Sequence, residues 1–254
     1  MKAIATRLFA HAYAIYGLSA FALSCLLILP AYFFVFNFTG PAAERNGLRV
    51  TRFWGRFVVN LLGIRLRVTG REKIDLDRNY IYVSNHLSQL DIPVTLAANP
   101  ALFKFLAKQE AARIPVVGYA LRKIYFLVDR SSAQSRAASI ATLRDAVKGG
   151  ASVHLYVEGS RNRGPRLLGE FQNGAFQLSA QTGVPLMVLT IVNTYRKLTA
   201  NRPFRLLPGT VHCHWNGPIV PLGDSPGELS SLKGMVHDIM EGHLRKYYGE
   251  EGLR

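Results

Sequence analysis

Residues 80–98 read YIYVSNHLSQLDIPVTLAA, and the prediction of the fold starts from this stretch. Residues 80–83 are a short run of aromatic and β-branched side chains, which indicates a buried strand. Polar residues 84–86 follow directly, and the largely apolar residues 92–98 are expected to begin a helix. A strand, a polar loop and a helix in this order are typical of an α/β sheet, in which ligands bind where strands end.

The alternation of strands and helices continues on both sides of this stretch. Further strands are expected at residues 64–68, 124–128, 152–157, 184–192 and 210–215. Helices are expected at residues 172–182 and 229–248, and between a capping serine at 131 or 132 and Gly149. We therefore predict an α/β fold with a mixed β-sheet flanked by helices.

The N-terminal part of the chain has the composition of a membrane segment. Residues 8–43 contain no Asp, Glu, Lys or Arg, and such a run is long enough to cross a bilayer core of roughly 30 Å. A cleaved signal peptide is the alternative, but the run is longer than usual and no small-x-small site closes it. Pro30 inside the run and basic residues on both sides of it leave two arrangements open, a single crossing and a re-entrant hairpin.

The following residues 45–61 have the pattern of an amphipathic helix. Its basic stripe consists of Arg45, Arg49, Arg52 and Arg56, and its apolar face of Val50, Phe53, Trp54, Phe57 and Leu61. Such a helix suits the surface of an anionic membrane, where each basic residue contributes about 1 kcal/mol. Packing of the same helix on its own domain, with a solvated charged face, is the alternative.

The net charge of +15 predicts an anionic partner, which is nucleic acid, lipid headgroups or a phosphorylated substrate. We expect no nucleic acid, because no nucleic-acid-binding motif accompanies the apolar N-terminus. The cysteines at 25 and 213 give no disulfide framework. His212 and His214 would share one face of a strand, and two ligands without a further cluster predict no metal site.

Two polar segments carry the candidate chemistry. His86 and Asp91 flank the predicted start of a helix, where a carboxylate can hold an imidazole as a general base. The segment Glu158-Gly159-Ser160-Arg161 also follows a predicted strand, and its arginine and glycine are suited to binding an anion. Lys108 and Arg130 add basic groups at predicted loop ends. Each pattern alone is also compatible with ordinary capping and surface residues.

Taken in order, these segments resemble the lysophosphatidic acid acyltransferase family of glycerolipid acyltransferases. The resemblance covers about residues 60–195 and rests on four blocks: Asn85-His86-x-Ser88-x-x-Asp91; residues 108–130 with Pro115, Gly118, Phe126 and Asp129-Arg130; Val157-Glu158-Gly159-Ser160-Arg161 with Phe171, Gly174 and Ala175; and Val184-Pro185-Leu186. Val157 and Ser160 depart from the Pro and Thr that many members have, so the acceptor stays open.

The resemblance implies transfer of an acyl chain from acyl-CoA or acyl carrier protein to a lysophospholipid, most specifically 1-acyl-sn-glycerol-3-phosphate, giving phosphatidic acid. It implies His86 as the base, Asp91 as its partner, and a substrate site of Lys108, Arg130, Glu158, Gly159, Ser160 and Arg161. No cofactor and no metal are expected. Transfer would be direct; a covalent serine at Ser88 or Ser160 is disfavoured because neither lies in a Gly-x-Ser-x-Gly turn.

The resemblance also implies an organisation and a location. Residues 1–60 are expected to be a membrane-embedded and interfacial helical region, and residues 61–254 the catalytic domain. The protein is expected in the inner (cytoplasmic) membrane, with its catalytic domain on the cytoplasmic side. The alternatives are an acyltransferase for another lysophospholipid or a lyso-aminolipid, and a membrane scaffold without activity.

Overall fold

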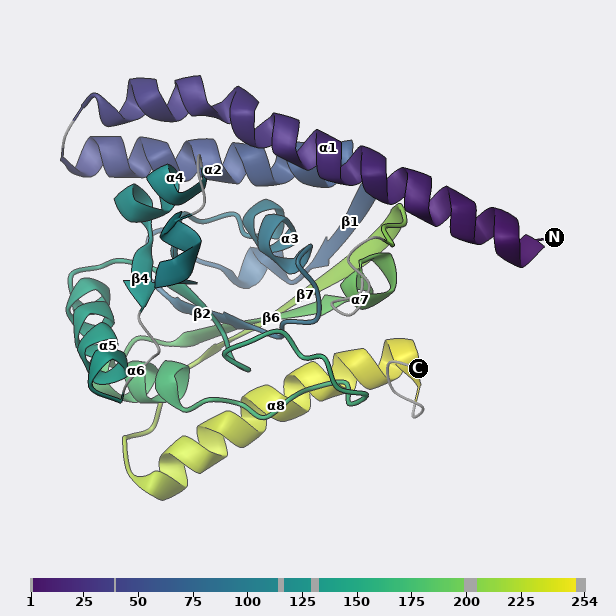
Figure 1. Ribbon diagram of the computed structural model, residues 1–254. Helices are drawn as coiled ribbons and strands as arrows, with labels where there is room; N and C mark the ends of the chain where they lie inside the picture. The colour runs from purple at the N-terminus through teal and green to yellow at the C-terminus, as the bar shows by residue number, and fades with distance from the viewer. Residues whose placement is uncertain (1, 39, 114–116, 129–132, 199–204, 250–254) are drawn as a thin grey trace.

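A computed structural model describes residues 2–38, 40–113, 117–128, 133–198 and 205–249. These residues fold into a central sheet with helices on both of its faces (Figure 1). The predicted α/β class with flanking helices is therefore confirmed.

The described residues form a seven-stranded sheet in the order β1-β7-β6-β2-β5-β3-β4. The strands are β1 (Ile64–Thr69), β2 (Ile81–Ser84), β3 (Lys104–Lys108), β4 (Phe126–Val128), β5 (Val153–Tyr156), β6 (Leu186–Val192) and β7 (Gly209–Ile219). Among these strands, β6 and β7 pair antiparallel and all other neighbours pair parallel, which is the mixed sheet that we predicted. Because β2, β5 and β3 are parallel neighbours, their carboxyl ends lie at one edge of the sheet.

Two layers of helices cover the sheet. One face carries α2 (Pro41–Leu61) and α3 (Asp91–Ala98), and the other carries α5 (Ala133–Lys148), α6 (Gly174–Thr182) and α8 (Pro226–Tyr248). The remaining helices are α1 (Lys2–Phe36), α4 (Val117–Ile124), α7 (Thr194–Lys197), and two short 3-10 helices, η1 (Arg71–Lys73) and η2 (Gln109–Arg113). The buried strand β6 has the sequence LMVLTIV, as expected for a strand covered on both faces.

Side chains of β5 alternate between the two layers, and this alternation positions the site. Val153 and Leu155 pack into the core beneath α5, α6 and α8. His154 and Tyr156 point to the opposite side, where they meet Phe105 of β3 in the layer of α2 and α3.

The part of the chain between β2 and β5 departs from the sequence prediction. The structure contains β3 and α4, neither of which the sequence analysis proposed, and β4 begins at Phe126 because Ile124 ends α4. The reason is that β3 is the five-residue run KFLAK, which is short and contains helix-forming residues. Pairing with β5 and β4, rather than local propensity, holds it extended.

The N-terminal residues form a helical hairpin (Figure 1). Within the described residues, Leu8–Phe36 of α1 is the one stretch that is long and apolar enough to cross a membrane, a test that signal sequences also pass. The helix continues through Pro30 without a break. The chain instead reverses around Gly40, which has a φ of 88°. The position of Pro30 therefore does not mark a re-entrant bend.

The amphipathic helix α2 packs through a different face from the one that its large apolar residues suggested. Its buried residues are mostly small or β-branched: Ala43, Gly47, Leu48, Thr51, Gly55, Val58 and Val59. Gly55 lies so close to α3 that a Cβ atom there would overlap the Leu96 side chain. Phe53 and Phe57 remain 69% and 41% exposed, next to the exposed side chains of Arg49 and Arg56. The helix thus packs on its own domain and still presents an Arg–Phe face outward.

Hydrogen bonds between side chains join the two helices of the hairpin. The Tyr32 and Thr51 hydroxyl groups lie 2.6 Å apart, and the Trp54 indole N–H donates to Ser24 Oγ at 3.1 Å.

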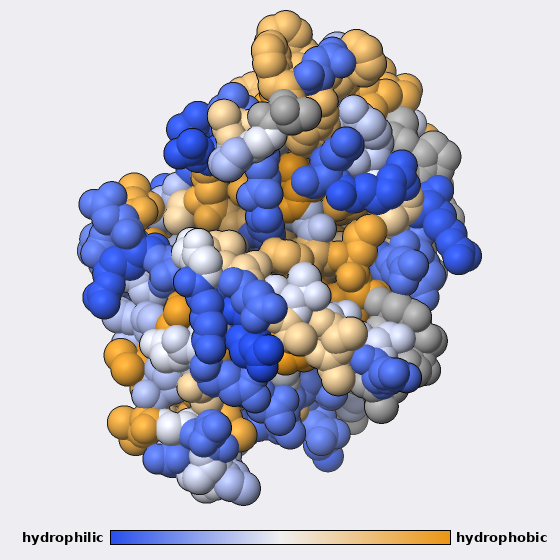
Figure 2. Space-filling model, turned by 90° about the vertical axis from the view of Figure 1, so that its left-hand side faces the viewer, coloured by the Kyte–Doolittle hydropathy of each residue, from blue (hydrophilic) through white to orange (hydrophobic). Residues whose placement is uncertain are grey.

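In the space-filling view, hydrophobic residues gather at the top, where the hairpin lies, and hydrophilic residues dominate below it (Figure 2).

Candidate functional site

The His86–Asp91 pair forms at the end of β2, as the sequence spacing predicted. His86 follows the strand in an extended loop, and Asp91 is the first residue of α3. His86 Nδ1 lies 2.9 Å from Asp91 Oδ2. The same oxygen accepts the backbone N–H groups of Leu87 and Ser88 at 2.7 Å each. Three donors therefore fix this carboxylate oxygen, and the loop wraps around it before the helix begins.

Asn85 anchors this loop to the neighbouring strand. Its amide nitrogen donates to the Ile191 carbonyl at 2.9 Å, and its oxygen accepts the Ile191 N–H at 2.8 Å. The side chain thereby extends the β2–β6 pairing by one step, at a residue that is itself fully buried. The Ser88 hydroxyl adds a second anchor, because it donates to the Leu198 carbonyl at 2.5 Å. Both residues belong to the first sequence motif, which did not by itself indicate these positioning contacts.

Glu158 joins the second polar segment to the first. One carboxylate oxygen accepts the His86 N–H at 3.0 Å, and the other accepts the Gly169 N–H at 3.1 Å. The Asn162 N–H also donates to the His86 carbonyl at 2.8 Å. Residues that are 72 positions apart are thus held together at the adjacent ends of β2 and β5.

Gly159 makes the turn after β5 possible. Its φ of 68° lies in the left-handed region, and a Cβ atom there would come within 2.9 Å of the Gln172 side chain. The following Ser160 is exposed and Arg161 is partly exposed. The turn therefore directs these two residues away from the core, at the edge of the sheet where His86 lies.

Of the two further basic residues in the predicted substrate site, Lys108 and Arg130, the structure places Lys108 at this same edge of the sheet. Lys108 ends β3, which pairs with β5, and its side chain is exposed. Arg130 lies outside the described residues. The structure thus brings together the chain segments of His86, Asp91, Glu158, Gly159, Ser160 and Arg161, with Lys108 one strand further along.

Burial shifts the pKa values of titratable groups next to the pair, among them Glu158 and His154. It raises the pKa of Glu158 to about 7, an effect that the N–H groups of His86 and Gly169 partly offset and that nearby Asp91 reinforces. Burial also lowers the pKa of His154 to about 3, with a smaller contribution from His86. His154 is therefore neutral at physiological pH, and its Nε2 lies 2.9 Å from Ser84 Oγ.

An aromatic side chain that the sequence analysis did not assign lies against the imidazole. The rings of His86 and Tyr156 are stacked, with centroids 4.0 Å apart and planes 15° apart. The only sequence indication was the position of Tyr156, two residues before Glu158 at the end of a predicted strand.

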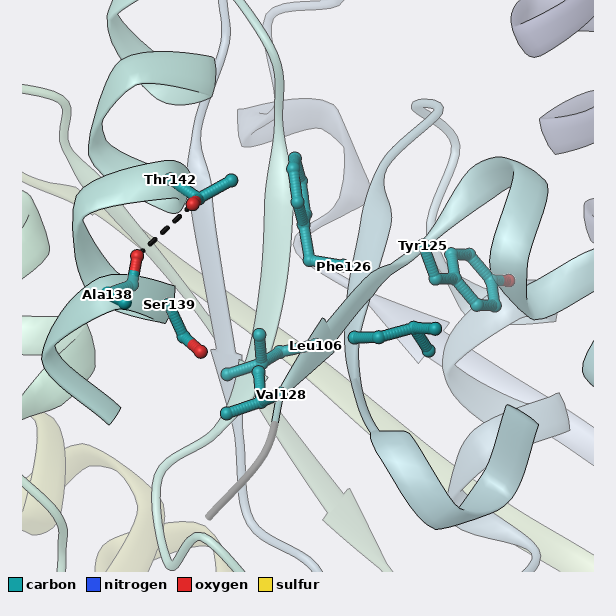
Figure 3. A pocket seen from close by; sticks show the side chains of 8 residues that line it. Leu106, Tyr125, Phe126, Val128, Ala138, Ser139 and Thr142 are labelled. Carbon is teal, nitrogen blue, oxygen red and sulfur yellow. Dashed lines mark hydrogen bonds between the residues drawn. The ribbon is translucent and has the colours of Figure 1, made fainter. Parts of the chain in front are cut away.

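An apolar cavity of about 360 Å³ lies elsewhere, between β3, β4 and α5 (Figure 3). Leu106, Phe126 and Val128 point from the strands toward α5, where Ala138, Ser139 and Thr142 form the other wall. Leu106 follows Phe105 in β3, so it faces the opposite side of the sheet from the Tyr156 stack. This cavity is therefore separated from His86 by the sheet.

His212 and His214 share one face of β7, and Cys213 is buried on the other, as the alternation predicted. No group of three or more potential metal ligands occurs among the described residues. The imidazoles of His214 and His243 stack at 4.4 Å with almost parallel planes. This geometry is a packing arrangement between β7 and α8.

Comparison with known proteins identifies the family of this chain. The sequence model of the acyltransferase family matches residues 65–192, which include both polar segments. A 1-acyl-sn-glycerol-3-phosphate acyltransferase of Borreliella burgdorferi is 31% identical over 181 residues, covering 70% of this chain and 71% of that protein.

Two plant relatives are longer than this chain. The chloroplastic 1-acyl-sn-glycerol-3-phosphate acyltransferase LPAT1 of Arabidopsis thaliana is 29% identical, over 80% of this chain and 56% of its own length. The chloroplastic enzyme BAT2 of Brassica napus, which has the same description, is 37% identical over 46% of this chain and 34% of its own length. The chain thus spans between a third and somewhat over half of these two proteins.

The fold is also known from a crystal structure. The 1-acyl-sn-glycerophosphate (LPA) acyltransferase PlsC from Thermotoga maritima superimposes with a TM-score of 0.82, covering 96% of this chain and 98% of that one, at 23% sequence identity. With the family match over half of the sequence and the Borreliella burgdorferi relative aligned over more than two thirds of both chains, this chain belongs to the acyltransferase family, among whose members are the 1-acyl-sn-glycerol-3-phosphate acyltransferases.

Proposed function

We propose that this protein transfers an acyl chain from a thioester to the free hydroxyl of 1-acyl-sn-glycerol-3-phosphate, giving phosphatidic acid. The observation that carries the proposal is the 2.9 Å contact between His86 Nδ1 and Asp91 Oδ2 at the end of β2. The descriptions of the relatives from Borreliella burgdorferi and Arabidopsis thaliana support the choice of acceptor.

In the proposed reaction, His86 is the general base. Its Nδ1 is engaged by the carboxylate, so Nε2 is the nitrogen that accepts the proton of the acceptor hydroxyl. The acceptor oxygen attacks the thioester carbonyl and forms a tetrahedral intermediate. The C–S bond then breaks, the thiol leaves with the proton from the imidazolium, and the new ester remains. Asp91 stabilises the imidazolium throughout with its negative charge.

We assign the remaining motif residues to substrate binding. Arg161 and Lys108 hold the phosphate of the acceptor, since guanidinium and ammonium groups pair with phosphate oxygens. Glu158 and Gly159 shape the loop that presents Ser160 and Arg161, through the N–H contacts and the turn that they make. Arg130 is assigned as a further basic helper. The donor is acyl-CoA or acyl carrier protein, and the reaction as proposed uses no cofactor.

We further propose that residues 1–60 attach the protein to a membrane and that residues 61–254 form the catalytic domain. The apolar stretch Leu8–Phe36 and the exposed Arg–Phe face of α2 support this division. A location at the inner (cytoplasmic) membrane, with catalysis on the cytoplasmic side, would place the site where acyl-CoA and acyl carrier protein are made.

The test is a transfer assay with purified protein in lipid vesicles. Release of free thiol from acyl-CoA or acyl carrier protein is recorded with and without added lysophosphatidic acid, and mass spectrometry identifies the lipid product. We expect thiol release that depends on the acceptor, and phosphatidic acid as the product. A different acylated lipid would redirect the acceptor to another lysophospholipid or a lyso-aminolipid. No release with any lysolipid would favour a scaffold without activity.

The first prediction concerns the base. His86→Ala should lower kcat about a thousandfold, because general-base catalysis contributes typically 10²–10⁴-fold. His237→Ala is the matched control, since His237 is a partly exposed histidine on α8 outside the site and its loss should leave kcat unchanged. Both variants should show the thermal stability of the parent. Full transfer by the His86 variant would refute the assigned role.

A further inference from the structure

Beyond the His–Asp pair, a third group acts on the imidazole of His86. The hydrogen bond to Asp91 fixes one nitrogen of the ring. A single contact of this kind leaves the ring free to tilt about the axis of the hydrogen bond. Tyr156 removes that freedom, because its ring lies 4.0 Å from the imidazole with planes only 15° apart.

The ring of Tyr156 is itself held from several sides. Phe105 lies nearly parallel to it at 6.0 Å, and His154 meets it edge to face at 5.1 Å. Its hydroxyl lies 3.5 Å from the Thr95 hydroxyl on α3. The Tyr156 ring is thus held in place and stacks against the imidazole. It extends from β5 on the face of the sheet that α3 covers.

The stack also has an electrostatic consequence for the proposed reaction. The face of an aromatic ring carries negative charge density, and it attracts a cation that lies over it. His86 becomes a cation only after it has taken the proton of the acceptor. Burial raises the pKa of the Tyr156 phenol well above its usual value, so the Tyr156 side chain stays neutral. His154, which contacts the same ring, is also neutral because its pKa is low, and so does not compete as a cation.

We propose that Tyr156 is a positioning residue that orients the His86 imidazole and stabilises the imidazolium through its aromatic face. The inference rests on the proposed function, because it concerns the proton that His86 accepts there. An interaction that strengthens as charge develops lowers the barrier rather than tightening substrate binding. The expected effect of losing it is therefore on kcat, with the KM values of donor and acceptor little changed.

Two substitutions separate the aromatic ring from the hydroxyl. Tyr156→Phe keeps the ring and removes the contact with Thr95, and it should retain kcat within about twofold. Tyr156→Leu removes the ring, and it should lower kcat about tenfold, within the range that cation–π contributions allow. In this variant the acidic limb of the kcat–pH profile should move to lower pH, because the protonated form of the base has lost a stabilising contact. A general loss of packing would not produce that shift.

A graded series tests the electrostatic part even if the leucine variant fails to fold. Phenylalanine with one, three and five fluorine atoms at position 156 keeps the shape of the ring while it weakens the charge on its face. We expect kcat to fall stepwise along the series, with thermal stability close to that of Tyr156→Phe.

A kcat that does not change along the series, an unchanged kcat in Tyr156→Leu, or an equal loss of kcat in Tyr156→Phe would overturn the inference. The parent measured alongside separates the two proposals: an inactive parent would refute the proposed function, whereas an active parent with a flat series would refute this inference alone.

Discussion

At the scale of single residues, one oxygen of Asp91 organises the candidate site. It accepts three donors, which are the imidazole of His86 and two backbone N–H groups, while the second oxygen is buried without a partner in the described part of the chain. The carboxylate therefore fixes the loop and the ring together. The effect of the Asp91 carboxylate on catalysis can be divided into its hydrogen bonds and its negative charge, because an asparagine at this position can accept the hydrogen bonds but carries no charge.

Asp91→Asn should keep the loop folded and still lower kcat about a hundredfold. The amide oxygen can occupy the place of Oδ2 and accept the same three donors, so the tautomer of His86 is retained and only the negative charge is lost. This loss is smaller than the factor of about 10⁴ that follows when such a substitution also reverses the tautomer. The amide N–H groups would be buried without a partner, at a cost to stability of about 1–3 kcal/mol.

The measurements for this prediction are kcat and the thermal midpoint. Asp91→Ala is the comparison, since it leaves all three donors without an acceptor and should be both less active and less stable than Asp91→Asn. If the two variants lost the same activity, the charge would not be the deciding property. If Asp91→Asn equalled the parent, stabilisation of the imidazolium by Asp91 would be excluded.

At the scale of elements, α8 is joined to the sheet by an apolar face and a histidine cluster. Leu232, Val236, Met240 and Leu244 are buried beneath the helix. Near its C-terminal end, His243 stacks on His214 of β7. The side-chain amide nitrogen of Asn216 donates to His243 Nε2 at 3.0 Å, and the Thr69 hydroxyl oxygen lies 2.8 Å from His214 Nδ1. The charged and titratable groups around the stack are His212, Tyr247, Arg67, Lys73 and Lys246.

This cluster should make the docking of α8 sensitive to acid. Burial, followed by the nearby His243, His212 and Lys246, lowers the pKa of His214 to about 4, and burial also lowers the pKa values of His212 and His243. Between pH 6.5 and 4 the unfolded chain therefore binds protons that the folded chain does not. The contribution to stability is present above pH 6.5 and is lost as the pH falls toward 4.

The check is the thermal midpoint of the parent and of His214→Asn across this range. Asparagine can still reach Thr69 and does not titrate, so the midpoint of the variant should fall less steeply between pH 6.5 and 4.5. Only the difference between the two proteins is informative, because the raised pKa of Glu158 acts in the opposite sense: it stabilises the folded state less as the pH rises from 4.5 to 7. Identical slopes would show that the cluster does not govern acid stability.

At the scale of the whole molecule, the α1–α2 hairpin lies on one side of the sheet and α8 on the other (Figure 1). The hairpin exposes many large apolar side chains, among them Leu8, Ile15, Leu27, Phe33, Phe34 and Phe53. Exposed apolar surface of this extent is typical of contact with a membrane. The proposed attachment then holds the catalytic domain beside the bilayer that contains the lipid acceptor.

The two tryptophans of the chain provide a test of this arrangement. Trp54 lies in α2 and is partly exposed, whereas Trp215 is buried in the core. In vesicles that contain brominated lipids, we expect quenching of the Trp54 fluorescence, because bromine quenches only at short range. Trp54→Phe should lose most of the quenching, and Trp215→Phe should retain it. If the Trp215→Phe variant, in which Trp54 is the one remaining tryptophan, showed no quenching, α2 would lie away from the bilayer.

Much of the fold was predictable from local patterns. Strands β2, β5, β6 and β7 and helices α3, α6 and α8 coincide with runs whose periodicity, capping residues or terminal glycines mark them in the sequence. The start of α3 at Asp91 explains why a spacing of five residues works, since His86 lies before the helix. In contrast, β3 has a weak local signal, and pairing with β4 and β5 holds it extended. The short helix α4, which was also not predicted, packs on η2 and α2.

The sequence by itself determined the α/β class and the apolar N-terminal segment, and together with the family resemblance it predicted the pairing of His86 with Asp91, because each depends on residues that are near one another in the chain. Only the tertiary structure decided that Tyr156 stacks on His86, that Glu158 binds the His86 N–H, and that α2 buries its small residues rather than its phenylalanines. These contacts join residues that are distant in sequence or select one face of a helix over another. Strand order and close packing specify them, and no local pattern encodes either.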